Sequence, residues 1–265
     1  MFKRLFFTVV AALAVILTSC SEGGGVNMFT LEDDKALGAQ IAAEIAAAPD
    51  SFPVLDSVAY PKAYALVYAI RDRILASGKV THKDDFIWQV RIINNDDVVN
   101  AFCTPGGYIY VYTGLIRYLD NEAQLAGVIG HEMAHADLRH STDQLTEAYG
   151  ISALVSLLLG DNAAVLGDIA VGLTQLAFSR GDESQADAYS VTYLCPNEYA
   201  ASGSAGFFEK IEAEGGVDVP EFLSTHPSPS NRINDIYAKT EELTCAGGAL
   251  HADRYDALIN ALPKK

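Results

Sequence analysis

Hydrophobic and polar positions along the chain predict helices at both ends and a small sheet between them. Thr30 to Asp33 has the form of a capping box, which opens a helix that continues to about Ala47. A second helix is predicted from Val58 to Ala76, with Pro61 in its first turn, where proline is tolerated. The folded part of the chain therefore begins with two helices.

Three segments rich in β-branched and aromatic residues follow and predict strands: Phe86–Ile93, Val98–Cys103 and Tyr108–Tyr112. A Thr-Pro-Gly-Gly turn joins the last two. From Asn121 onward the pattern is helical almost to the end, where a short helix is expected from His251 to Leu262. A small sheet followed by helices predicts an α+β fold that is mainly helical.

The first residues have the pattern of a targeting signal. Lys3 and Arg4 precede an apolar run, Leu5–Leu17, which is too short to span a bilayer with margin but fits a signal-peptide core. The Leu-Thr-Ser-Cys sequence that ends at Cys20 resembles the bacterial lipobox, in which cleavage leaves a lipid-modified cysteine. A cleaved signal without lipidation is the alternative. Ser21 after the cysteine favours the outer membrane over the inner one.

These signals divide the chain into three parts. Residues 1–19 are predicted to be a lipoprotein signal peptide, 20–29 a lipidated cysteine with a flexible tether, and 30–265 a single domain. We therefore expect a protein of the bacterial cell envelope that is lipid-anchored and faces the periplasm.

The composition narrows the possible partners. The 265-residue chain carries 34 acidic and 18 basic residues, for a net charge of -16. Such a chain is repelled by nucleic-acid phosphates and by anionic lipid headgroups, which argues against nucleic-acid binding. With 50% hydrophobic and 20% charged residues, the composition also excludes a disordered tail, a fibre and a coiled coil.

The cysteines allow one disulfide after lipidation. If Cys20 carries lipid, then Cys103, Cys195 and Cys245 remain, and an exported protein can form a disulfide. The sequence leaves three pairings open. We favour Cys195–Cys245, because Cys103 belongs to a strand motif described below.

The strongest chemical signal is the pentad His131-Glu132-Met133-Ala134-His135. On a helix, residues four apart project from one face, so both imidazoles can bind one metal ion. Glu132 lies beside them, where it can take a proton from metal-bound water. Apolar residues around the pentad predict a largely buried helix, which argues against a solvated His/Glu face.

A zinc hydrolase needs a third protein ligand and an open fourth position. The candidate is Glu183, and Asp187 follows it on the same helical face, where it can accept a hydrogen bond from a ligand imidazole. His140 is set aside, because nine residues past His131 it points about 180° away on an ideal helix.

Several motifs in order resemble a known family. The segments 100–115, 131–135, 183–187 and 225–233 match its Asn-Ala…Pro-Gly-Gly, His-Glu-x-x-His, Glu-x-x-x-Asp and His-Pro…Arg-Ile elements. The chain is similar to the zinc endopeptidase family of the CAAX prenyl protease and the bacterial heat-shock membrane protease, in its soluble periplasmic lipoprotein branch. The resemblance implies a zincin-like fold with a small sheet beside the helix of the pentad.

The resemblance assigns roles to individual residues. It implies one zinc ion held by His131, His135 and Glu183, with Glu132 as the general base. Asp187 would support a ligand histidine. His226 would either steady the oxyanion or occupy the fourth zinc position at rest, and Arg232 would hold that segment through a salt bridge or carbonyl contacts.

The strand motif is expected to bind substrate. The Tyr108–Tyr112 strand would offer its backbone edge to an extended polypeptide, with Asn100, Tyr108, Ile109 and Tyr110 as the candidate residues. Cys103 is disfavoured as a nucleophile, because a cysteine protease does not need Glu132 and Glu183.

Two features differ from the family's membrane and repeat-bearing members. Segments 146–160 and 163–178 are each too short to span a bilayer, so we expect amphipathic or buried helices that cover the cleft. About thirty residues follow Arg232, which leaves no room for a C-terminal repeat domain.

The sequence thus predicts a zinc-dependent metalloendopeptidase that cleaves unfolded or misassembled cell-envelope proteins. Two alternatives stay open: a chaperone-like or scaffold lipoprotein with little turnover, and a zinc hydrolase that acts on something other than peptide. A binding module would not need Glu132, and the strand motif disfavours a non-peptide substrate.

Overall fold

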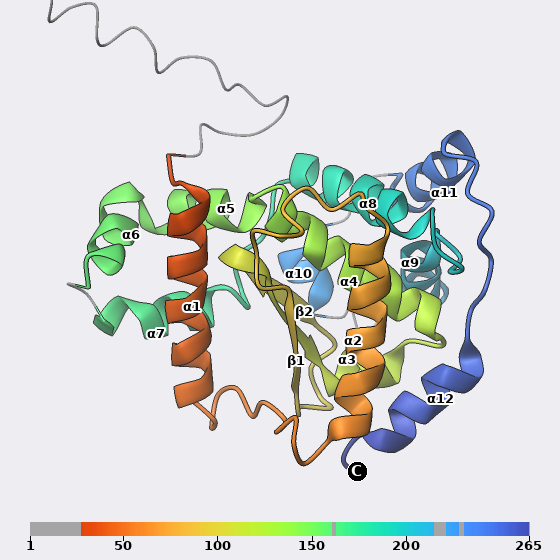
Figure 1. Ribbon diagram of the computed structural model, residues 1–265, viewed down its shortest axis with the longest axis horizontal. Coiled ribbons are helices and arrows are strands. Elements are labelled where there is room, and N and C mark those ends of the chain that lie inside the picture. Colours follow the sequence, from red (N-terminus) through yellow and green to blue (C-terminus); the bar gives the residue numbers. More distant parts are fainter. Residues whose placement is uncertain (1–27, 161–162, 215–220, 228–230, 265) are drawn as a thin grey trace, which may run out of the picture.

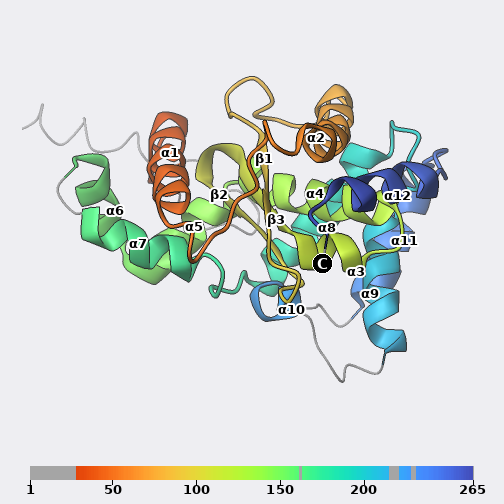
Figure 2. The same cartoon turned by 90° about the horizontal axis from the view of Figure 1, so that it is seen from below.

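A three-stranded sheet lies at the centre of the molecule. The computed structural model describes residues 28–160, 163–214, 221–227 and 231–264. The strands are β1 (Gln89–Ile93), β2 (Ala101–Thr104) and β3 (Tyr108–Tyr112), in the spatial order β1-β3-β2. β1 pairs with β3 in parallel, and β2 pairs with β3 antiparallel. Figures 1 and 2 show helices on both faces of this sheet.

Two helices precede the sheet and most of the others follow it. α1 (Leu31–Ala47) and α2 (Pro61–Ala76) come first, and a 3-10 turn, Pro105–Gly107, joins β2 to β3. The later helices are α3 (Thr113–Tyr118), α4 (Glu122–Asp137), α5 (His140–Tyr149), α6 (Ile151–Leu158), α7 (Ala163–Gly172), α8 (Arg180–Leu194), α9 (Gly203–Ala213), α10 (Phe222–Thr225), α11 (Arg232–Glu242) and α12 (Ala252–Ala261).

The predicted elements are present, with boundaries that differ by a few residues. The capping box at the start of α1 is confirmed. The Thr30 side chain accepts a hydrogen bond from the Asp33 backbone N–H, and the Asp33 carboxylate accepts one from the Thr30 backbone N–H. β1 begins at Gln89 rather than Phe86, because Trp88 has a positive φ of 45° that interrupts extended backbone. The α+β, mainly helical class is confirmed.

One expectation about the sheet is wrong. We expected the Tyr108–Tyr112 strand to offer a free backbone edge, but β3 is the central strand and is paired on both sides. A β-strand that already has two partners has no backbone groups left to bind a polypeptide. Sequence pattern does not reveal strand order, which depends on how three separate segments pair.

Each face of the sheet packs into its own core. Ile109 and Val111 face the larger core, which α2, α4, α8, α9 and α12 complete. Phe102 and Tyr110 stack with ring centroids 4.8 Å apart in the smaller core, which α1, α6 and α7 complete. Alternation along the strands thus sends successive side chains to two different helical layers.

The segments 146–160 and 163–178 form the end of α5 together with α6 and α7, and these last two helices pack against α1 (Figure 1). The second segment ends at Phe178, whose ring stacks on His135. That the two helices cover a cleft stays a prediction. In the part of the chain that the structure describes, no helix is both long enough and apolar enough to span a bilayer.

A disulfide joins Cys195 and Cys245, as favoured from the sequence. Cys195 caps the C-terminus of α8, and Cys245 lies just after α11. Cys103 is a free, buried thiol on β2. The bond therefore ties two helices of the larger core together at one end.

Candidate metal centre

The candidate site lies between α4 and α8, and small residues allow these helices to approach closely. Every residue of α4 is buried. A Cβ on Gly130 would lie 2.9 Å from Ser190 Oγ of α8. That hydroxyl donates to the backbone carbonyl of Gly127 at 2.8 Å. The contact brings the C-terminal half of α8 against the middle of α4.

Four buried side chains converge at this contact. His131 and His135 project from α4, Glu183 from α8, and His226 follows α10. One ligating atom from each lies within 4.8 Å of the others. None of the four side chains is more than 1% exposed. The i, i+4 spacing of the two α4 histidines puts them on one face, as predicted.

The separations in this cluster fit a metal ion. Zinc bonds of 2.0–2.1 Å in tetrahedral geometry place neighbouring ligand atoms about 3.3 Å apart. The Nε2 atoms of His131 and His135 are 3.0 Å apart, and His135 Nε2 is 3.2 Å from Glu183 Oε1. His226 Nδ1 lies 2.9 Å from the same oxygen and 3.3 Å from His131 Nε2. The four side chains are therefore spaced to bind a metal ion that prefers tetrahedral coordination, such as zinc.

The other nitrogen of His131 has a carboxylate partner. His131 Nδ1 lies 2.9 Å from Asp187 Oδ1, as expected from the sequence. If Nδ1 donates there, Nε2 has a free lone pair that faces the cluster. Asp187 thereby selects the tautomer of His131 that can bind a metal.

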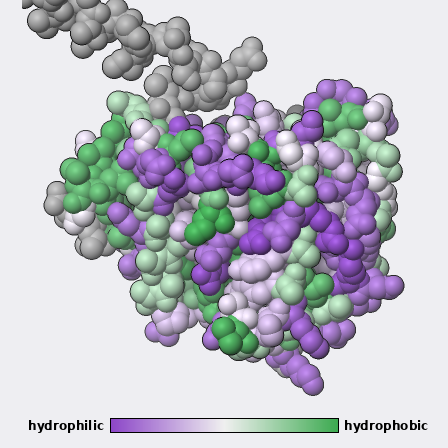
Figure 3. Space-filling model, in the orientation of Figure 1, coloured by the Kyte–Doolittle hydropathy of each residue, from purple (hydrophilic) through white to green (hydrophobic). Residues whose placement is uncertain are grey.

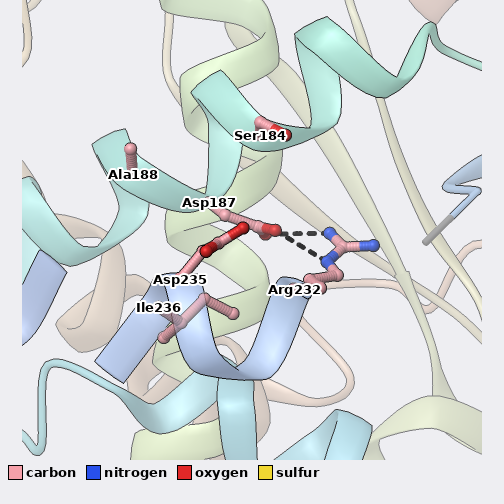
Figure 4. Close-up of a pocket in the computed structure, with 6 residues that line it drawn as sticks. All are labelled: Ser184, Asp187, Ala188, Arg232, Asp235 and Ile236. Carbon is pink, nitrogen blue, oxygen red and sulfur yellow. Dashed lines mark hydrogen bonds and ion pairs between the residues drawn. The ribbon is translucent and has the colours of Figure 1, made fainter. Parts of the chain in front are cut away.

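Arg232 connects this carboxylate to the rest of the site. Its guanidinium lies 2.7 Å from Asp187 and 3.0 Å from Glu183 Oε2, and it donates to the His226 carbonyl at 3.3 Å. Figure 4 shows Arg232 from α11 directed at Asp187 on α8, beside a small pocket. Both kinds of contact expected of Arg232, salt bridge and carbonyl, are present.

His140 is part of the site, contrary to the sequence analysis. Its Nδ1 lies 3.1 Å from His135 Nδ1, and its Nε2 lies 3.2 Å from Gln185 Oε1. The prediction assumed one continuous helix. Instead α4 ends at Asp137, Arg139 adopts the left-handed conformation with φ 65°, and α5 starts a new direction at His140. No local pattern marks that turn, since Arg139 is not a glycine.

Glu132 lies at the edge of the cluster in a fully buried position. His226 Nε2 is 3.4 Å from Glu132 Oε1. Within the described residues, neither oxygen of Glu132 has a hydrogen-bond partner. A buried carboxylate without donors is costly, and such groups mark a place where a ligand, ion or water binds.

Burial and charge shift the pKa values of the cluster. Burial disfavours the cation of His131, but the charges and hydrogen bonds of Glu183 and Asp187 together outweigh burial and raise the pKa of His131 to about 9. Burial lowers the pKa of His135 well below its usual value. Burial opposes ionisation of Glu183, yet His226 and His131 hold its pKa well below the usual range. Burial raises the pKa of Glu132, which makes it a stronger base.

Aromatic rings enclose the histidines. Phe178 stacks on His135 with centroids 3.7 Å apart, and Phe222 stacks on His226 at 4.2 Å. Neither phenylalanine was predicted from the sequence to belong to the site. The two rings hold the imidazoles in position and place apolar surface against the cluster.

The remaining predicted residues lie outside the cluster. Asn100 accepts from the Ala101 backbone through Oδ1 at 2.8 Å and shapes the start of β2. Tyr108, Ile109 and Tyr110 belong to the paired central strand. Cys20 lies outside the described residues.

A comparison of the chain with models of protein families agrees with the motifs and with the buried cluster. The model of the family described as "Peptidase family M48" matches residues 61–240, which is more than half of the chain. The chain belongs to peptidase family M48. Members of this family use zinc, and the His131, His135, Glu183 and His226 cluster supplies donors suited to that ion.

Individual members of family M48 are also similar to the chain. It is 33% identical over 161 residues to mitochondrial metalloendopeptidase OMA1 of Arabidopsis thaliana, which covers 59% of this chain and 32% of that protein. It is 33% identical over 168 residues to the beta-barrel assembly-enhancing protease of Escherichia coli (57% and 34%). It is 30% identical over 145 residues to metalloprotease YcaL of Escherichia coli (52% and 57%). The chain thus spans about a third of the length of the first two relatives.

Proposed function

We propose that the chain is a zinc-dependent endopeptidase. The observation that carries this proposal is the convergence of four buried donors beside an unpartnered buried carboxylate, Glu132. His131, His135 and Glu183 would hold the ion. Membership in family M48, and relatives whose names are those of proteases, support the same activity.

The chain's own residues divide the work of peptide hydrolysis. Bound zinc supplies Lewis acidity, which polarises a peptide carbonyl and makes water acidic near neutral pH. Glu132 accepts the proton as water attacks and later delivers a proton to the leaving amine. Asp187 and Arg232 keep His131 and Glu183 oriented throughout, so that the donors do not have to reorganise.

His226 has two candidate roles, and its geometry favours one of them for the resting enzyme. Nδ1 is directed at Glu183 and His131, and Nε2 is directed at Glu132. In this position the ring occupies the space that water and the scissile carbonyl need. We infer that His226 takes the fourth ligand position at rest and moves aside when substrate enters.

We infer that the substrates are unfolded or misassembled proteins of the bacterial cell envelope. The predicted lipoprotein signal with Cys20 would anchor the domain 30–265 to the outer membrane, facing the periplasm. The similarity to a protein named beta-barrel assembly-enhancing protease supports this setting.

The decisive test is cleavage of unfolded casein by the zinc-loaded protein, with and without a chelator. Glu132→Gln keeps the shape of the side chain and removes its basicity, so cleavage should fall by several orders of magnitude with zinc content unchanged. Glu147→Gln, an exposed change on α5, is the matched control and should retain full activity.

The scaffold alternative makes a different prediction for the same assay. If the zinc-loaded chain does not cleave casein, or Glu132→Gln cleaves as fast as the parent, the protease proposal fails. Metal analysis of His135→Ala tests the ligand set separately, because undiminished zinc there would exclude His135 as a ligand.

The anchor has its own test. The lipid on Cys20 should make the chain fractionate with membranes, and Cys20→Ser should release it after a salt wash. Retention of Cys20→Ser on membranes would show that another part of the chain holds it there.

A further inference from the structure

α6 exposes large apolar side chains in a row. Ile151, Val155 and Leu159 are four residues apart, so they follow one face of the helix and its C-cap. They are 39%, 41% and 72% exposed, and Val171 on the neighbouring α7 is 44% exposed. We call these four residues the α6–α7 apolar face. Figure 3 shows hydrophobic residues gathered at this end of the molecule.

This face lacks the charges that a helix in water normally carries. The sequence Ile151–Leu159 contains only Ser152 and Ser156 as polar residues. Its opposite side, with Leu154 and Leu157, is already buried in the smaller core. A helix that is apolar on both sides buries both of them, so the outer side requires a partner.

The place of α1 in the fold indicates which partner covers this face. Leu31 at the start of α1 follows the predicted lipid site, Cys20, by eleven positions. Eleven steps of extended chain reach at most about 40 Å. α6 and α7 both pack against α1, at the same end of the molecule (Figures 1 and 2). An anchored chain can therefore bring this face to the bilayer.

We propose that the α6–α7 apolar face rests in the membrane interface, among the lipid headgroups and upper acyl chains. The proposal rests on the proposed Cys20 anchor. With a net charge of -16, the chain gains nothing from anionic headgroups, so the contact depends on insertion of apolar side chains. Anchor and face together would fix the orientation of the domain, because one lipid attachment alone leaves it free to rotate.

Lipid quenching of a tryptophan tests the contact directly. The lipidated full chain with Leu159→Trp is bound to vesicles of phosphatidylcholine brominated on the acyl chain and compared with unbrominated vesicles. Val58→Trp is the matched control, since Val58 is 85% exposed and lies three residues before α2, a helix that α1 and the sheet separate from α6. The native Trp88 is buried and gives the same background in both proteins.

We expect bromolipid to reduce the added emission of Leu159→Trp at least twofold and to leave that of Val58→Trp unchanged. Equal quenching at both positions, or none at position 159 in protein that floats with vesicles, overturns the proposal. A dimer in sedimentation with a vesicle-independent blue shift at position 159 overturns it in favour of a second copy. Protein that does not float overturns anchor and contact together.

Two further measurements separate this proposal from the proposed function. Casein cleavage by both tryptophan variants shows that they are folded, and it tests the peptidase independently of any lipid contact. Val155→Glu in the Leu159→Trp protein places a charge on the same face and should reduce the bromolipid quenching. Undiminished quenching would contradict insertion of this face.

Discussion

In each of the two α4 histidines, the ring nitrogen that points away from the cluster has a hydrogen-bond partner. Asp187 contacts Nδ1 of His131, and His140 contacts Nδ1 of His135. Burial lowers the pKa of His140, which keeps it neutral and able to accept through Nδ1 while Nε2 donates to Gln185. Two local hydrogen bonds thus direct both Nε2 lone pairs at one point.

His140→Ala should weaken zinc binding about 10- to 100-fold, because loss of a partner of a ligand histidine has this effect in metal sites. Competition with a chromophoric chelator measures the affinity without reference to activity. His82→Ala, a histidine with a different partner, Asp85, is the control and should bind zinc like the parent. An unchanged affinity for His140→Ala would mean that packing alone orients His135.

At the scale of elements, the site depends on the close approach of three helices. α4 contacts α8 on one side and α9 on another, and Gly127 lies against the first residues of α9. A Cβ on Gly127 would lie 2.4 Å from the backbone nitrogen of Ser204. Backbone cannot rotate away as a side chain does, so a methyl group here forces the helices apart.

Gly127→Ala should therefore destabilise the fold by about 3 kcal/mol or more, despite the higher helix propensity of alanine. For a domain of this size that corresponds to a fall in Tm of roughly 6–12 °C. Gly181→Ala on α8 is the control, because its Cβ would meet nothing closer than 3.6 Å. Thermal denaturation of both variants measures the difference, and equal Tm values would contradict the packing argument.

At the scale of the whole molecule, the Cys195–Cys245 disulfide closes a long segment that includes much of the site. The two cysteines are 50 residues apart, and His226 and Arg232 lie between them. The bond closes a loop in the unfolded chain and so reduces the conformational entropy that this segment loses on folding. It fits the exported location proposed for the protein, where disulfides persist.

Cys195→Ser with Cys245→Ser should lower the free energy of unfolding by about 4 kcal/mol, as expected for a loop of this length. Urea denaturation measures the loss, and a reductant should reproduce it in the parent. Glu241→Gln, an exposed change on α11 between the two cysteines, is the control and should leave stability unchanged. A double variant as stable as the parent would show that native packing alone holds the segment.

Features that depend only on neighbouring residues could be predicted from the sequence. The bounds of α1, the β3 segment and the shared face of His131 and His135 follow from local backbone geometry, in which a period of 3.6 or 2 residues orders the side chains. Membership in the family was also predictable, because its motifs are short and keep their order. The ligand and base roles carried over from that resemblance remain predictions.

Tertiary structure decided everything that joins distant segments. The central place of β3 and the contact between His140 and His135 each contradicted a prediction made from one segment at a time. Strand order and helix packing minimise exposed apolar surface over the whole chain, so no local pattern encodes them. A single left-handed residue, Arg139, sufficed to turn His140 back toward the site.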